Sequence, residues 1–321
     1  MQKVYLVTGV AGFIGSALAA ALLQRGERVR GVDNFATGKR ENLKRCEGLE
    51  FIEGDIGDTA CAQRACEGVE VVFHEAAIPS VPRSVAQPLE SNRANVDATV
   101  NLLVAARAAG VERVIYAASS SAYGNSATLP KREDFVPAPL SPYAAAKLAG
   151  ELYLQAFHAS YGLTTLSLRY FNVFGPYQDA NSPYAAVLAR FINAMLDGNA
   201  PQVNGDGEQS RDFTYIDNVV AANLLAAEAP ADRVAGKVVN VATGERTSLQ
   251  QVLALLRPML GYTGEVHYGP ERSGDVKHSL ADIRRARELL GYEPQVSFAE
   301  GLERTVGWYR GQGARGASLK A

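Results

Sequence analysis

The sequence predicts an α/β protein, built as a doubly wound parallel sheet with a smaller, discontinuous α/β domain attached. In the first half, short runs rich in Val and Ile alternate with longer helical patterns. Such alternation is typical of parallel strands joined by crossover helices. The runs lack clean polar alternation, which indicates a sheet covered by helices on both faces. A glycine-rich turn follows the first run.

Six strands are predicted in the first half, at 4–8, 28–32, 49–52, 69–73, 113–117 and 164–168. The longest helices are predicted at about 89–109 and 142–160, the second with Ser141 as N-cap and Pro142 in its first turn. After Tyr170, breakers such as Gly175-Pro176 predict a loop-rich region. The stretches 217–228 and 237–241 are expected to return to the main sheet. We therefore predict a first domain of 1–172 plus about 216–242, a second of about 173–215 plus 243–311, and a flexible tail at 312–321.

Composition excludes several function classes. The 321 residues include 32 basic and 34 acidic side chains, so the formal charge of −2 offers no basic footprint for a nucleic acid. Three cysteines are too few and too irregularly spaced for a disulfide framework or a zinc site, and no other metal site is expected. The sequence contains no run of about 18 uninterrupted apolar residues, so no membrane span is predicted. We expect a soluble, cytoplasmic protein with reduced thiols.

A dinucleotide site is predicted where the first strand meets the first helix, in the sequence Val7-Thr8-Gly9-Val10-Ala11-Gly12-Phe13-Ile14-Gly15. Glycines there permit a tight turn, a close approach to a pyrophosphate and close helix packing. Asp33 ends the second strand, where a carboxylate accepts from both ribose hydroxyls and repels a 2′-phosphate. This order of features favours NAD over NADP. Asp55, after the third strand, is placed to reach an adenine edge.

A reactive pair is predicted in Ser141-Pro142-Tyr143-Ala144-Ala145-Ala146-Lys147. Tyr143 and Lys147 are four residues apart and project from one helix face. A free phenol has a pKa of about 10, so we expect Lys147 and a positive nicotinamide ring to lower the pKa of Tyr143 and make it a general base. Ser119 follows the fifth strand, at the edge where such sheets bind ligands, and is expected to help pass a sugar hydroxyl proton to Tyr143.

Together these motifs resemble the extended short-chain dehydrogenase/reductase family, over nearly the whole chain. The likeness also rests on His74-Glu75-Ala76-Ala77, Asn95, Tyr123-Gly124 and Arg169-Tyr170-Phe171-Asn172. Within the family the chain is most similar to UDP-sugar 4-epimerases of the UDP-glucose and UDP-N-acetylglucosamine type. The resemblance implies a Rossmann-type sheet, bound NAD, a UDP-sugar substrate and a homodimer paired through the helices that start near Leu89 and Pro142.

The resemblance assigns three groups of site residues. The catalytic residues are Tyr143, Lys147 and Ser119. The cofactor contacts are Gly9, Gly12, Phe13, Ile14, Gly15, Asp33, Asn34, Asp55, Ile56, Ala76, Ala77, Asn95, Tyr143, Lys147 and Tyr170. The substrate contacts are Ser80, Arg83, Ser119, Ser121, Tyr143, Asn172, Val187, Asn204, Arg211, Arg272, Asp275 and Ser279. Among these, Arg211 and Arg272 look like the family's diphosphate clamps, because bidentate charge-assisted bonds are the strong kind.

Side chains missing from the sequence separate the chemistries of the family. Sibling dehydratases carry Asp and Glu after the Ser119 position, and sibling decarboxylases carry Glu at the second of those places, where this chain has Ser120 and Ser121. Epimerisation through a 4-keto sugar, with hydride stored on NAD, therefore remains. Ser279 falls on the family's gatekeeper position and leaves volume for a 2-N-acetyl group, which favours UDP-N-acetylglucosamine and UDP-N-acetylgalactosamine, with UDP-glucose and UDP-galactose as further substrates.

Three alternatives stay open. UDP-glucuronate 4-epimerases resemble one another in an arginine that follows a Gly-Pro pair and is directed at the sugar carboxylate. After Gly175-Pro176 this chain has Tyr177 instead, although Arg83 offers a substitute cation. A nucleotide-sugar reductase using NAD(P)H would consume added cofactor. A dinucleotide sensor without turnover would not need Tyr143 or Lys147. Both residues are present, which disfavours this alternative.

Overall fold

A seven-stranded parallel sheet organises the computed structural model, which describes residues 3–179, 187–271 and 277–318. The strand order is β11-β6-β5-β4-β1-β2-β3, and every neighbouring pair is parallel. The strands are β1 (Val4–Thr8), β2 (Arg28–Asp33), β3 (Glu50–Glu53), β4 (Val71–His74), β5 (Arg113–Ser119), β6 (Thr164–Tyr170) and β11 (Lys237–Val241). The predicted doubly wound sheet is confirmed, and 237–241 does return to it as an edge strand.

The strand order reverses direction between β1 and β4. In the register, Thr8 of β1 lies beside Val32 of β2 on one side and His74 of β4 on the other. The connections that follow β1 and β4 therefore diverge, one toward each end of the sheet. In open α/β sheets ligands bind at such a switch point, outside the carboxyl ends of the strands.

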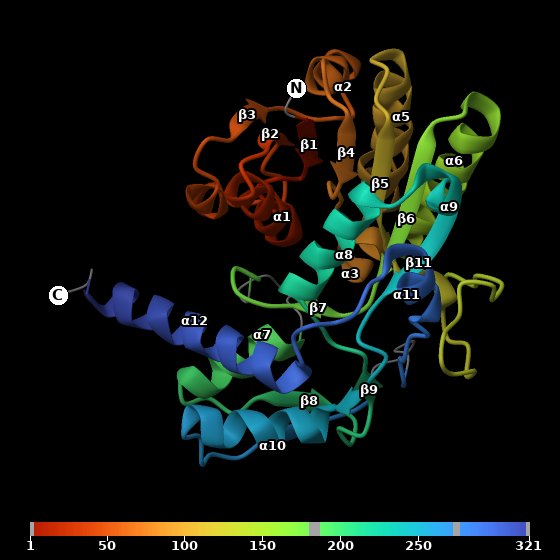
Figure 1. Cartoon of the computed structure of the whole chain (residues 1–321). Coiled ribbons are helices and arrows are strands. Elements are labelled where there is room, and N and C mark those ends of the chain that lie inside the picture. The colour runs from red at the N-terminus through yellow and green to blue at the C-terminus, as the bar shows by residue number, and fades with distance from the viewer. Residues whose placement is uncertain (1–2, 180–186, 272–276, 319–321) are drawn as a thin grey trace.

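Helices cover both faces of the sheet because its strands are apolar on both faces. Alternate residues of β1 face opposite sides, so Val7 joins the cluster with Leu18 and Val219 while Leu6 joins Leu102 and Leu154. One face is covered by α1 (Phe13–Gln24) and α8 (Ile216–Glu228), and the other by α2 (Thr59–Cys66), α5 (Ala98–Ala108) and α6 (Pro142–Tyr161). These layers form the upper part of the molecule in Figure 1.

Short elements connect the layers, and a second group of elements lies beyond the carboxyl ends of the strands (Figure 1). The short connections are η1 (Arg40–Arg45), α3 (Val81–Ala86), α4 (Pro88–Asn92), η2 (Arg93–Asp97), η3 (Ser120–Tyr123) and α9 (Ala231–Val234). The second group holds β7 (Val173–Phe174), α7 (Val187–Leu196), β8 (Gln202–Asn204), β9 (Ser210–Arg211), β10 (Thr214–Tyr215), β12 (Thr247–Ser248), α10 (Leu249–Leu260), β13 (His267–Gly269) and α12 (Phe298–Ser318). Helix α11 (Arg284–Leu290) instead packs beside β11 and α8 (Figure 1).

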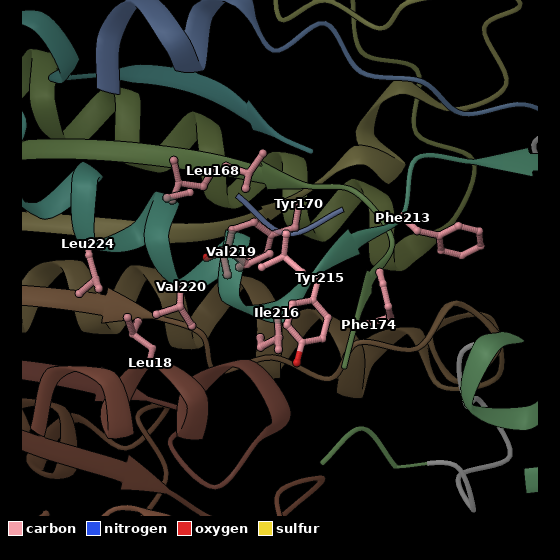
Figure 2. Close-up of a cluster of buried hydrophobic side chains, with 14 of the residues drawn as sticks. Leu18, Leu168, Tyr170, Phe174, Phe213, Tyr215, Ile216, Val219, Val220 and Leu224 are labelled. Carbon is pink, nitrogen blue, oxygen red and sulfur yellow. The ribbon is translucent and has the colours of Figure 1, made fainter. Parts of the chain in front are cut away.

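An aromatic cluster joins this second group to the main sheet. Figure 2 shows Tyr170 at the end of β6, with Phe174, Phe213 and Tyr215 continuing the cluster away from the sheet. The ring centroids of Phe174 and Phe213 are 6.2 Å apart, and Phe298 of α12 lies 5.2 Å from Phe213. Aromatic rings bury large apolar areas. The hydrophobic core is therefore continuous from the sheet into the second group.

Several local expectations need adjustment. The predicted helix at 89–109 is three consecutive pieces, α4, the π-helical η2 and α5. The region after Tyr170 contains more helix than its glycines and prolines suggest, and α12 continues to Ser318, into the segment expected to be a flexible tail. Ser141 does cap α6, accepting from Ala144 N at 3.1 Å. In the described part of the chain, none of the helices combines the length and apolarity that crossing a membrane requires.

Gly15 provides a test of the close helix packing at the switch point. A Cβ atom there would lie 2.3 Å from the carbonyl oxygen of Gly9. We expect Gly15→Ala to lower the free energy of unfolding by about 1–3 kcal/mol, despite the better helix propensity of alanine. Gly307→Ala in α12, where a Cβ meets nothing within 4 Å, should instead raise it by about 0.5–1 kcal/mol. Urea unfolding measures both, and a stabilised Gly15→Ala variant would contradict the packing argument.

Candidate active site

The glycine-rich turn after β1 is shaped by backbone contacts that exclude larger side chains. Gly9 adopts φ 66°, and a Cβ there would lie 2.8 Å from the backbone of Ala76. Gly12 is the N-cap of α1 and provides no side-chain cap, so the first N–H groups of the helix have no side-chain partner there. Those groups face a cavity of about 800 Å³. A pyrophosphate fits this environment of backbone donors and helix dipole.

Asp33 lies at the carboxyl end of β2 and is oriented by the same turn. Its carboxylate accepts from Ala11 N at 2.9 Å and from Phe35 N at 2.7 Å. Burial raises the pKa of Asp33, and these two backbone hydrogen bonds oppose that rise. Beside it, Asn34 Nδ2 donates to Asp55 Oδ2 at 2.8 Å, and both side chains line a second cavity of about 720 Å³. The two cavities share Gly9, Asp33, Ala76 and Ala77, as a dinucleotide site spanning both would require.

The segment after β4 forms the opposite wall of these cavities. Asn95 of η2 accepts from Ile78 N through Oδ1 at 2.9 Å, and it lines neither cavity. Asn95 therefore holds the wall from behind, rather than facing the cavity as a cofactor contact would. His74 is buried between Thr8 Oγ1 at 2.8 Å and Thr99 Oγ1 at 2.9 Å. Burial lowers the pKa of His74 to about 3, so the ring is neutral.

Ser119, Tyr143 and Lys147 converge on the larger cavity from β5 and α6. The Ser119 hydroxyl accepts from Ser121 N at 3.2 Å and from Ser121 Oγ at 2.8 Å, and Ser119 lies near enough to Tyr143 to lower the pKa of that phenol. Lys147 is 3% exposed, and its Nζ donates to Ala117 O at 2.8 Å and lies 4.7 Å from the Tyr116 ring centroid. The predicted catalytic group is thus assembled in one place.

The expected lowering of the pKa of Tyr143 is not produced by the chain itself. Burial raises the pKa of this phenol, and only the hydrogen bond with Ser119 opposes that rise. Burial lowers the pKa of Lys147 to about 8, which leaves it charged near neutral pH, but with its Nζ bonded to a carbonyl this charge does not reverse the rise. A phenolate at Tyr143 therefore needs further positive charge in the cavity, in addition to that of Lys147, which the ring of a bound NAD⁺ would supply.

Glu75 is a cavity residue that the sequence reasoning did not assign to the site. It follows β4 directly, and Tyr170 OH donates to its Oε1 at 2.8 Å. Tyr170 OH also accepts from Asn223 Nδ2 of α8 at 2.8 Å. The available signal was positional, since an acidic residue immediately after the strand at the switch point faces the ligand edge. Lys39 and Asp179, which form an ion pair at 2.9 Å, line the same cavity and were also missed.

The structure brings together part of the predicted substrate set. Ser80, Arg83 and Asn172 line the larger cavity with Ser119 and Tyr143. Ser80 caps α3 by accepting from Arg83 N at 3.1 Å, and Arg83 binds Glu90 through two nitrogens, at 2.7 and 3.2 Å. The residues that line neither cavity are Ser121, Val187, Asn204, Arg211 and Ser279. Arg272 and Asp275 lie outside the described residues.

A buried carboxylate positions the part of the chain that carries Arg211 and Ser279. Asp212 is 0% exposed and accepts from Thr243 N at 2.9 Å, Thr243 Oγ1 at 2.7 Å, Gly244 N at 3.0 Å and Ala281 N at 3.2 Å. Burial raises the pKa of Asp212 to about 6, and these hydrogen bonds oppose the rise. Asp212 therefore ties three separate segments together. Sequence reasoning passed over it in favour of the neighbouring arginine.

Comparison with known proteins gives a consistent picture. Residues 5–242 match the model of the NAD dependent epimerase/dehydratase family. The chain is 41% identical, over 95% of its length and 98% of the relative's, to a UDP-glucose 4-epimerase of Mycolicibacterium smegmatis. It is similar to the solved UDP-N-acetylglucosamine 4-epimerase of Methanobrevibacter ruminantium in complex with UDP-N-acetylmuramic acid, at 42% identity and TM-score 0.91, covering 97% of this chain and 99% of that one.

A further likeness is to the UDP-glucuronic acid 4-epimerase of Bacillus cereus in complex with UDP-glucuronic acid and NAD, at 33% identity and TM-score 0.89, covering 97% of this chain and all of that one. In this chain two adjoining cavities contain the glycine turn, Asp33, and the group formed by Ser119, Tyr143 and Lys147. The fold around these cavities is the one shared with the two solved structures. From its sequence match and its fold, the chain belongs to the NAD dependent epimerase/dehydratase family.

Proposed function

We propose that the chain is an NAD-dependent 4-epimerase of UDP-hexoses. The observation that carries this proposal is the convergence of Ser119, Tyr143 and Lys147 on the cavity that also contains the glycine turn. A proton acceptor and a dinucleotide cradle in one cavity suit oxidation and reduction of a sugar hydroxyl. Relatives named as 4-epimerases of UDP-glucose, UDP-N-acetylglucosamine and UDP-glucuronate support the reaction class.

The protein's own groups carry the proton steps. Tyr143 accepts the proton of the sugar C4 hydroxyl, with Ser119 beside the phenol and Lys147 supplying positive charge in the same cavity. Bound NAD supplies hydride uptake and return at C4, so the coenzyme is regenerated and no external reductant is used. The 4-keto sugar must turn its other face toward the dinucleotide site before the C4 carbonyl is reduced, and the proton then returns to the C4 oxygen. The large cavity gives room for that rotation.

We further propose that UDP-N-acetylglucosamine and UDP-N-acetylgalactosamine are the preferred pair, with UDP-glucose and UDP-galactose also accepted. Support comes from the small side chain at Ser279, in a segment fixed to β9 through a bond from Ser279 N to Ser210 O at 3.0 Å. The UDP-glucuronate alternative needs a cation for the sugar carboxylate. Arg83, the candidate for that role, is bound bidentately by Glu90, which disfavours this alternative.

We also propose a homodimer, which the resemblance to UDP-sugar 4-epimerases implies. Large apolar side chains are exposed on neighbouring helices, with Val104 of α5 at 53% and Leu152 of α6 at 57%. Two copies pairing through these helices would remove this apolar surface from water. A cytoplasmic location is also proposed, supported by three cysteines that are all buried and free.

Turnover without added cofactor tests the reaction. We expect the purified chain to interconvert UDP-N-acetylglucosamine and UDP-N-acetylgalactosamine, with products identified by proton NMR. Tyr143→Phe should lower turnover by at least about 10²-fold, because the proton acceptor is lost, while nucleotide binding persists. Consumption of added NADH in proportion to product would instead indicate a reductase. Retained turnover in Tyr143→Phe would remove this phenol from the mechanism.

The gatekeeper assignment is tested by Ser279→Tyr. We expect turnover of the N-acetylated pair to fall by about tenfold or more, because the larger side chain fills the proposed acetyl space, while turnover of UDP-glucose changes little. Steady-state kinetics on both pairs measures the ratio. An equal loss on both pairs would show a general defect rather than selection at this position.

The proposed dimer is tested by Leu152→Glu. A charge in a desolvated helix interface should shift the sedimentation coefficient from dimer to monomer, because burying an unpaired carboxylate is costly. Leu196→Glu on α7, where the side chain is 38% exposed, provides the matched control and should leave the dimer intact. Persistence of the dimer in Leu152→Glu would place the interface elsewhere.

A further inference from the structure

Three carboxylates line the larger cavity, and they differ in their partners. Asp33 accepts from two backbone N–H groups, and Asp179 forms an ion pair with Lys39. Glu75 instead accepts from the neutral hydroxyl of Tyr170. Its charge is therefore not neutralised by a direct cation among the described residues. The proton step proposed above does not use it, although it lies in the same cavity as Tyr143.

The Tyr170 hydroxyl fixes the orientation of the Glu75 carboxylate. A phenol has one proton to donate. Asn223 Nδ2 donates to this hydroxyl at 2.8 Å, and of the two acceptors in reach of the hydroxyl proton the Glu75 carboxylate, with Oε1 at 2.8 Å, is nearer than Asn223 Oδ1 at 3.1 Å. Burial raises the pKa of Glu75 to about 7, while the bond from Tyr170 and the charge of Lys147 oppose the rise. Above this pH a carboxylate is held in a set position beside the catalytic group.

Lys147 depends on carboxylates that it does not touch. Its Nζ bonds to Ala117 O, and no carboxylate oxygen in the described ranges forms an ion pair with it within 4.0 Å. Glu75 is the largest influence that raises the pKa of Lys147 against its burial, followed by Glu151. Glu151, however, is bound by two nitrogens of Arg169, at 2.7 and 2.9 Å. Glu75 is thus the carboxylate whose charge is not already matched by a direct ion pair.

In the protein alone, before any charge from a bound coenzyme is added, the other titratable groups around Lys147 are neutral near pH 7. His74 of β4 has its pKa lowered to about 3 by burial. Tyr116 of β5 has its pKa raised well above its usual value by burial, and burial also raises that of Tyr143 on α6. The ammonium state of Lys147 is therefore set mainly by the carboxylates and by burial.

We propose that Glu75 is a positioning residue that keeps Lys147 protonated and so sets the alkaline limit of the proton step at Tyr143. The inference rests on the proposed 4-epimerase function for its consequence in catalysis. Its electrostatic part rests on Glu75 and Lys147 lining one cavity, in which Tyr170 and Asn223 hold the Glu75 carboxylate. Removing the charge of Glu75 lowers the pKa of Lys147, so the ammonium is lost at lower pH. Epimerisation should then decline at lower pH on its alkaline side.

The test is E75Q, which keeps the shape and an oxygen acceptor for Tyr170 but removes the charge. In protein labelled with ¹³C at lysine Cε, the signal absent from K147R identifies Lys147, and its titration midpoint is read directly. We expect the midpoint to fall by about one pH unit in E75Q. The alkaline limb of the kcat/KM profile should move in the same direction by a similar amount.

Two further variants separate charge from structure. E112Q, on an exposed residue that precedes β5 at the opposite edge of the sheet, should leave both quantities as in the wild-type chain. E75M removes both charge and hydrogen bond, and should reproduce the E75Q midpoint if charge is the cause. An unchanged Lys147 midpoint in either folded Glu75 variant overturns the role of Glu75. Absence of turnover in the wild-type chain overturns the proposed function, and the NMR midpoint still decides on Glu75.

Discussion

The close approach of two backbones at the switch point is the constraint on which the site depends. The turn after β1 passes so near the segment after β4 that a Cβ on Gly9 would lie 2.8 Å from Ala76. The helix that follows is equally close, since Gly15 packs against the Gly9 carbonyl. This packing leaves backbone donors facing the cavity in place of side chains. It also places Glu75, immediately before Ala76, at the same edge.

Keeping that edge in place requires polar contacts that are not themselves in the cavity. Asn95 binds the backbone of Ile78 from a π-helical turn, and Ser80 caps the helix that begins next. In the second group of elements, Asp212 binds backbone N–H groups of two other segments and a threonine hydroxyl. Buried polar groups are costly unless satisfied, so each of these residues specifies one arrangement of its loop. The cavity walls are thereby held by residues behind them.

The strands and the catalytic group of the first half could be predicted from the sequence because the local pattern and the tertiary structure agree there. The strands lie within a few residues of their expected places, and Ser119, Tyr143 and Lys147 meet in one cavity as the helix spacing predicts. The second half was harder because long-range packing overrides its breakers. Gly301 lies inside α12 where a Cβ would meet the Tyr215 ring at 2.7 Å, so this glycine marks close packing rather than a loop. Glu75 was missed because its role depends on Tyr170 and Asn223, which are distant in sequence. The division into two domains and the role of each site residue stay predictions.

Two buried cations near the site illustrate different solutions to one electrostatic problem. Arg169, 3% exposed, carries a guanidinium that stays charged at every accessible pH, and the two oxygens of Glu151 match that charge directly at 2.7 and 2.9 Å. Lys147 is equally buried but is bonded to a carbonyl and balanced only at a distance. Its pKa, lowered to about 8 by burial, therefore lies close to neutrality. If Lys147 formed a direct ion pair, the charge of its partner would offset its own charge at the phenol. Without a direct partner, Lys147 keeps a charge that can act on the neighbouring phenol of Tyr143. The protonation state of Lys147 then depends on where the Glu75 carboxylate is held.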